Sequence, residues 1–196
     1  MLTDKSIRDF INELKSSAPT PGGGGVAALV AANGVALIMM VANKTICNDK
    51  YAEWKLVNES VLKEAEDLLN NLVEGVDTDA EVFSKLMDSY KTKDDKVIGT
   101  ASVAAAFAPL SVMNACVRAL ELCSALLGKS NPTVESDLYV AAQCLNAGLE
   151  SAKYNVDANI DGIMKMDEHL AEEMTTGSEE LLAQGRALAA GIIVQK

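Results

Sequence analysis

Hydrophobic residues recur along this chain with the spacing of helices rather than strands. Apolar residues at i, i+3, i+4 and i+7 from Ile7 predict an amphipathic helix over about residues 4–16. The next predicted helix, about 23–45, is apolar on nearly every face, which is typical of a central helix. No segment alternates with period two for long enough to be a strand. The pattern therefore predicts an all-α fold, a bundle of long helices around central apolar helices.

Further helices are predicted from the same spacing and from residues that begin or end helices. Gly75 is expected to end one helix, and Thr78-Asp79-Ala80-Glu81 matches the T-x-x-E capping box that would start another. Pro109 is expected to kink or split a second mostly apolar helix. The segment "TTGSEE", 175–180, is expected to separate the last two helices. The predicted ranges are about 50–74, 78–90, 97–127, 135–170 and 179–194.

The organisation of the chain predicts a single helical domain over residues 1–196, because no repeat, linker or low-complexity segment interrupts it. Two helices without a polar face are more than a thin bundle needs. Either the other helices of the chain wrap around them or a partner chain buries them, and we expect a homodimer. The uncharged segment 22–43 opens with glycines and is rich in Ala rather than Leu and Ile. We interpret it as a buried helix of a cytoplasmic protein with no membrane span.

Composition narrows the partners that the chain can have. Lys and Arg number 17 against 28 Asp and Glu, a formal net charge of −11, which argues against nucleic acid as a partner. The four cysteines form no C-x-x-C pair, and His169 is the single histidine. We therefore expect reduced core thiols and no metal site.

The stretch "PTPGGGGVAA" contains the first candidate binding residues, Pro21, Gly22, Gly23, Gly24 and Gly25. Backbone N–H groups at a helix N-terminus form an anion site, and glycine lets a ligand approach the backbone. No G-K-[ST] follows, so the stretch is not a Walker motif. The alternative is a flexible turn before a helix.

Five polar residues are further candidates, each with a structural alternative. Asp79 and Asp137 are either functional carboxylates or acidic residues favoured in a first helical turn. Asn155 and Asn159 share a helix face and either meet a ligand or hydrogen-bond another helix. Lys91, in a cluster of lysines, either holds a carboxylate tail or lies in a solvated loop.

The order of these features resembles the C-terminal family of formiminotransferase-cyclodeaminases. The resemblance covers roughly residues 5–165 and is carried by five segments in the family's order: "PTPGGGGVAA", "DTDAEVFSKLMDSYK", "AFAPLSV", "SNPTVESDLYVAA" and "KYNVDANI". It implies an all-helical dimer that closes 5-formiminotetrahydrofolate to 5,10-methenyltetrahydrofolate with release of ammonia. The alternatives are a methenyltetrahydrofolate cyclohydrolase that gives 10-formyltetrahydrofolate, a folate-binding homologue without activity, or a helical dimer without a ligand.

The resemblance also implies roles for the candidate residues. Asp79 is the first choice for acid–base chemistry and Asp137 the second, whereas Asn155 and Asn159 would hydrogen-bond the pterin edge. The glycine stretch would admit the ligand, and Lys91 would meet the glutamate tail of a tetrahydrofolate, including a polyglutamylated one. No cofactor beyond the tetrahydrofolate substrate is expected. Gly25 departs from the family pattern, which usually has serine at this position.

Overall fold

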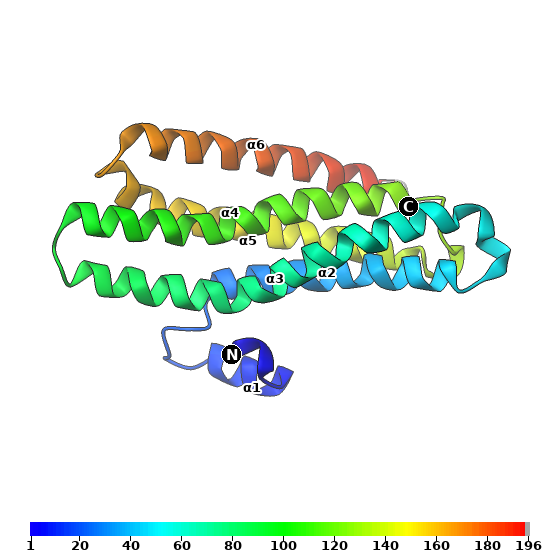
Figure 1. Cartoon of the computed structure of the whole chain (residues 1–196), viewed down its shortest axis with the longest axis horizontal. Helices are drawn as coiled ribbons and strands as arrows, with labels where there is room; N and C mark the ends of the chain where they lie inside the picture. The colour runs from blue at the N-terminus through cyan, green and yellow to red at the C-terminus, as the bar shows by residue number, and fades with distance from the viewer. Residues whose placement is uncertain (195–196) are drawn as a thin grey trace.

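The structure, a computed structural model, describes residues 1–194 and consists of helices joined by short connections (Figure 1). No strand occurs in that range, which confirms the prediction of an all-α bundle. The elements, with η for a 3-10 helix, are η1 Leu2–Asp4, α1 Ile7–Leu14, α2 Gly23–Ile46, η2 Asp49–Trp54, α3 Lys55–Tyr90, α4 Asp95–Leu126, η3 Pro132–Val134, α5 Ser136–Met164 and α6 Glu168–Ile193.

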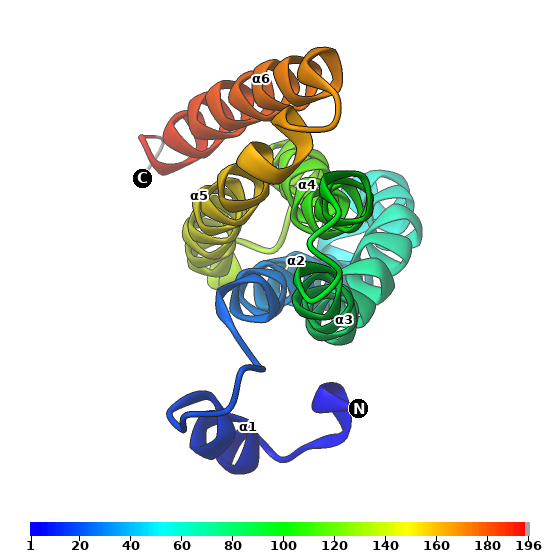
Figure 2. The same cartoon turned by 90° about the vertical axis from the view of Figure 1, so that its left-hand side faces the viewer.

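Helices α2 to α5 run up and down beside one another and form the body of the bundle. Figure 2 shows them end-on, with α6 packed on one side against α4 and α5 and with α1 on the opposite side. Helices α3 and α5 run in one direction, and α2 and α4 run in the other (Figure 1). The α3–α4 and α5–α6 turns therefore lie at the same end of the bundle.

The central position of α2 follows from its composition. Val35, Ile38 and Val41 are fully buried, and Gly34 allows α5 to come close. A Cβ on Gly34 would lie 2.8 Å from Leu145 Cγ. By length and composition α2 and α4 could each cross a membrane, but 56% of the most apolar window of each is buried inside the bundle. Both are core helices of this fold.

The N-terminal segment lies to one side of the bundle, and Asp77 of α3 holds its start. This carboxylate accepts hydrogen bonds from the Leu2 backbone N–H and the Thr3 hydroxyl (2.6 Å for the latter). Phe10 of α1 is buried, whereas Ile7 and Ile11 are 87% and 52% exposed. One apolar edge of α1 therefore faces outward.

Helix α3 continues through the point where a break was predicted. A Cβ placed on Gly75 would lie 3.5 Å from the Ala28 Cβ of α2 and 3.9 Å from the Val112 Cγ2 of α4, so α3 packs closely on both helices here. The Thr78 hydroxyl donates to the carbonyl of Glu74 (3.0 Å) and caps nothing. The predictions of a helix end at Gly75 and a capping box at Thr78 are wrong, because packing on two helices stabilises this segment.

The last two helices meet about ten residues earlier than predicted. Helix α5 ends at Met164, and Asp167 caps α6 by accepting a hydrogen bond from the Leu170 N–H (3.1 Å). The segment 175–180 lies inside α6, where the Thr175 hydroxyl donates to a carbonyl one turn earlier (2.8 Å). The predicted break is wrong because the helix itself satisfies this polar group.

Helix α4 continues unbroken through Pro109. A proline removes one backbone donor from a helix and crowds the preceding turn. Pro109 is nevertheless buried in the packing of the bundle, which holds the helix on both sides of it. Of the two alternatives predicted for this proline, the split is wrong.

Candidate active site

Helix α2 begins partway along the bundle, level with the second halves of α3 and α5. Its first residue, Gly23, lies beside Asn155, where an added Cβ would be 3.6 Å from the amide oxygen. Its next residues, Gly24 and Gly25, lie beside Asp79. Beyond this level α3, α4 and α5 surround the bundle axis, with α6 outside them (Figure 1).

A cavity of about 240 Å³ occupies the space that α2 leaves open. Three polar residues, Asp79, Asn155 and Asn159, line it together with apolar side chains from α3 and alanines from α4 and α5. The apolar lining residues are Val82, Phe83, Leu86, Met87, Tyr90, Ala105 and Ala158. The cavity thus has a few polar groups set in an apolar wall, which is typical of small-molecule sites.

The Asp79 carboxylate lies against the first turn of α2. Its Oδ2 accepts a hydrogen bond from the Gly25 backbone N–H at 2.9 Å. Gly24 leaves the space for this contact, because a Cβ there would lie 2.0 Å from Asp79 Oδ1. The first turn of a helix carries unpaired N–H groups and partial positive charge, so it can hold a carboxylate.

The environment of Asp79 shifts its acidity. Burial raises the pKa of the Asp79 carboxyl above its ordinary value of 3.8, and the hydrogen bond from Gly25 acts in the opposite direction with a smaller effect. A carboxyl with a raised pKa that lines a cavity is suited to donate and accept protons. This is the physical basis for placing acid–base chemistry at Asp79.

The two asparagines point their amide groups along α5. Asn155 Nδ2 donates to the carbonyl of Ser151, and Asn159 Nδ2 donates to the carbonyl of Asn155, both at 2.8 Å. Each side chain therefore keeps its Oδ1 and one N–H for another partner. Within residues 1–194 neither makes the hydrogen bond to another helix that was the structural alternative, so both groups can serve a ligand in the cavity.

The remaining predicted site residues lie around or away from this cavity. Pro21 is buried and Gly22 is the N-cap residue of α2, so both directly precede the glycines at the cavity. Lys91 follows Tyr90 but is exposed and pairs with Asp88 at 2.6 Å. Asp137 stands in the first turn of α5, 18 residues before Asn155, about 27 Å along the helix axis. Within one chain the structure does not bring Lys91 or Asp137 into the cavity.

Sequence reasoning did not identify the apolar wall as part of a site. The α3 residues of the wall stand 3, 4, 7, 8 and 11 positions after Asp79, which is the spacing of one helix face. Extending that face from Asp79 would have identified them. Ala105 and Ala158 carry no comparable signal, because their position depends on how three helices pack.

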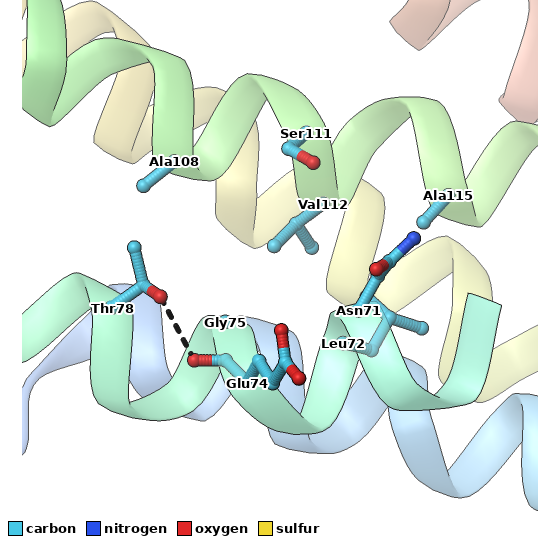
Figure 3. A pocket seen from close by; sticks show the side chains of 9 residues that line it. All are labelled: Asn71, Leu72, Glu74, Gly75, Thr78, Ala108, Ser111, Val112 and Ala115. Carbon is cyan, nitrogen blue, oxygen red and sulfur yellow. Dashed lines mark hydrogen bonds between the residues drawn. The ribbon is translucent and has the colours of Figure 1, made fainter. Parts of the chain in front are cut away.

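A second hollow, of about 290 Å³, lies between α3 and α4, and Thr78 is one of the residues that line it (Figure 3). Small side chains line it, among them Gly75, Ala108 and Ala115, and its single carboxylate belongs to the exposed Glu74. The groove has no carboxyl group withdrawn from solvent, whereas the partly buried Asp79 faces the first cavity. We therefore place the candidate active site at the Asp79 cavity.

A helical bundle that holds a carboxyl group of raised pKa in a mostly apolar cavity has the features of an acid–base enzyme of small-molecule metabolism. Comparison with known protein families supports a specific assignment. Residues 6–180 match the formiminotransferase-cyclodeaminase family, and the chain belongs to that family.

Individual relatives agree with this assignment. The chain is 36% identical to a methenyltetrahydrofolate cyclohydrolase of Methylorubrum extorquens, over 96% of this chain and 94% of that protein. It is 27% identical to the formimidoyltransferase-cyclodeaminase of Rattus norvegicus, over 98% of this chain but only 37% of that longer protein. The crystal structure of formiminotetrahydrofolate cyclodeaminase from Thermotoga maritima superposes with a TM-score of 0.92, at 28% identity, over 98% of this chain and 96% of that one.

Proposed function

We propose that this protein is a folate one-carbon enzyme that converts 5-formiminotetrahydrofolate to 5,10-methenyltetrahydrofolate and releases ammonia. The observation that carries the proposal is the Asp79 carboxyl, which is held by the α2 N-terminus in a cavity and has a raised pKa. Family membership and the similarity to the Thermotoga maritima cyclodeaminase support the same activity.

The reaction requires a proton donor at one step. N10 of the substrate attacks the formimino carbon and gives a tetrahedral carbon bonded to N5, N10 and an amino group. The C–N bond to that amino group then breaks, and the electron pair leaves with the nitrogen as ammonia. Because an amide anion is a very poor leaving group, the nitrogen must be protonated before or during this step.

In this proposal Asp79 supplies that proton. Its raised pKa increases the protonated fraction near neutral pH compared with an exposed aspartate. After proton transfer, the Gly25 N–H and the positive end of α2 stabilise the carboxylate that forms. Asn155 and Asn159 would hold the hydrogen-bonding edge of the pterin through the amide oxygen and the second N–H that each keeps for another partner.

The second candidate reaction is hydrolysis of 5,10-methenyltetrahydrofolate to 10-formyltetrahydrofolate. The 36% identity to the Methylorubrum extorquens cyclohydrolase, over nearly the full length of both chains, favours it. In this reaction water adds to the methenyl carbon, and Asp79 would act first as a base that accepts a proton from the water. A folate-binding role without turnover is the third alternative.

One assay separates these alternatives. The purified protein is mixed with each tetrahydrofolate, and the methenyl absorbance and ammonia are followed together. Formation of the methenyl compound with stoichiometric ammonia from the formimino substrate supports cyclodeamination. Loss of methenyl absorbance without ammonia assigns the protein to hydrolysis, and binding without turnover leaves only the folate-binding role.

Three further properties belong to the proposal. Ile7 and Ile11 give α1 an exposed apolar edge, and this supports a homodimer; sedimentation that gives the mass of one chain would contradict it. Lys91, next to the cavity-lining Tyr90, supports binding of a polyglutamate tail. A KM that is independent of tail length would contradict that role.

We also propose that the enzyme is cytoplasmic and needs no cofactor beyond its tetrahydrofolate substrate.

A further inference from the structure

We infer that Tyr90, supported by Met87, is the platform on which the aminobenzoyl ring of the tetrahydrofolate substrate stacks. The inference rests on the proposed function and adds which part of the substrate lies at which end of the cavity. It makes Tyr90 a residue that determines affinity for the substrate and takes no part in the chemical step.

The cavity has two ends of different character. Asp79 and Asn155 lie at its inner end, against the first turn of α2. Tyr90 lies eleven residues further along α3, about 16 Å toward the α3–α4 turn. Because α3 and α5 run in the same direction, Asn159 stands one turn further out than Asn155. The carboxyl and amide groups are therefore confined to the inner and middle parts of the cavity.

The outer end is apolar and open to solvent. Met87 is 39% and Tyr90 49% exposed, although both line the cavity. Within residues 1–194 the Tyr90 hydroxyl has no hydrogen-bond partner among the side chains and backbone groups around it. Two large, partly exposed side chains that lie together at the mouth of a cavity form a surface suited to binding.

The size of the cavity decides how much of the substrate it can enclose. Its volume of about 240 Å³ is below the range of roughly 300–1,000 Å³ that encloses a drug-sized ligand. It can hold a bicyclic ring, and the rest of a tetrahydrofolate must then lie at the mouth. The pterin carries most of the donors and acceptors of the fused rings, so it pairs with the polar inner part.

The aminobenzoyl ring is joined to the pterin through one methylene and N10, and it therefore follows the pterin toward the outer end. Its flat apolar faces match the ring of Tyr90 and the flexible thioether of Met87. Stacking requires the aromatic ring of Tyr90 and does not require its hydroxyl. N5 and N10, the atoms that react, belong to the pterin and its linker, so they stay on the inner side of the aminobenzoyl ring, toward Asp79.

The test compares the variants Tyr90→Ala and Tyr90→Phe with the unaltered protein. Steady-state kinetics with the turned-over tetrahydrofolate give kcat and KM, and calorimetry gives the affinities for two fragments, 6-methyltetrahydropterin and p-aminobenzoylglutamate. Tyr154→Ala is the matched control, because Tyr154 is 75% exposed on α5 and lines a different groove.

We expect Tyr90→Ala to raise KM roughly tenfold with little change in kcat, and to weaken p-aminobenzoylglutamate binding by a similar factor. Affinity for 6-methyltetrahydropterin should stay within about twofold, and Tyr90→Phe and Tyr154→Ala should behave as the unaltered protein does. An unchanged KM in Tyr90→Ala, or equal losses for both fragments, would overturn the inference. Failure of the unaltered protein to bind any tetrahydrofolate would instead overturn the proposed function, and the inference with it.

Discussion

Gly24→Ala tests the contact between α2 and the Asp79 carboxyl directly. The new Cβ would lie 2.0 Å from Oδ1, 2.5 Å from Cγ and 2.9 Å from Oδ2 of Asp79. Real Cβ atoms essentially never come closer than 3.0 Å to such a neighbour, so the carboxyl group must move by at least 3.0 − 2.0 = 1.0 Å. Movement away from the new Cβ takes the carboxyl group from the first turn of α2 toward the cavity that it lines.

The displacement sets the size of the expected effect. A misplacement of about 1 Å in a catalytic group costs roughly 100-fold in rate, equivalent to about 2.7 kcal/mol. We therefore expect kcat to fall roughly 100-fold. The lost hydrogen bond to the carboxylate is worth about 1.5–3 kcal/mol, and alanine regains about 1 kcal/mol of helix propensity. The free energy of unfolding should thus fall by only about 0.5–2 kcal/mol.

Two comparisons make the test specific. A Cβ on Gly25 would lie 3.3 Å from the Val76 carbonyl oxygen and 3.8 Å from Asp79 Oδ2, so Gly25→Ala should reduce kcat by roughly fivefold at most. Gly177→Ala in α6, where no heavy atom lies within 4 Å of the new Cβ, controls for glycine substitution itself. The assay is methenyl formation with urea unfolding in parallel. A folded Gly24→Ala protein with unaltered kcat would refute the role given to Asp79.

Three further predictions concern Asp79, the contact between α2 and α5, and the start of the chain. Asp79→Asn should lower kcat roughly 100-fold. Because the Asp79 carboxyl has a raised pKa in the folded protein, the unaltered protein loses stability as the pH rises above 3.8. Urea unfolding midpoints should therefore show that the Asn variant gains stability relative to the unaltered protein most at neutral pH and not at all below pH 3.8. Gly34→Ala should destabilise the fold by about 1–3 kcal/mol, because its Cβ would meet Leu145 of α5 at 2.8 Å; an unfolding midpoint equal to that of Gly177→Ala would contradict this packing. Asp77→Ala should release the start of the chain, which limited proteolysis would detect as faster cleavage before α2; unchanged cleavage would mean that other contacts hold it.

The helical character of the chain and its central helix could be predicted from sequence, because 3.6-residue spacing and uniform apolarity are local properties. Helix ends were harder to predict. Gly75 resembles a stop signal, yet its small size lets α3 pack between α2 and α4, and only the packed structure shows this. The polar segment at Thr175 likewise resembles a turn in the sequence, but in the structure the Thr175 hydroxyl donates a hydrogen bond to a carbonyl of its own helix.

The candidate site, too, could be predicted from the sequence only in part. Asp79 and the asparagine pair could be singled out from residue type and motif, and the structure brings them to one cavity. That the glycine stretch contacts Asp79, 54 residues away, depends on where α2 begins relative to α3. Asp137 and Lys91 matched equally good motifs, but within one chain Asp137 lies near the opposite end of α5 and Lys91 is exposed outside the cavity lining.

The starting point of α2 has a consequence for how this protein can be redesigned. Each additional helical turn placed before Gly23 would extend α2 by about 5.4 Å and fill part of the cavity, while the removal of a turn would deepen it. The other helices would keep their lengths and their contacts with one another. Changing the length of one helix at its N-terminus therefore offers a way to alter which ligands fit, separately from the residues that carry out the chemistry.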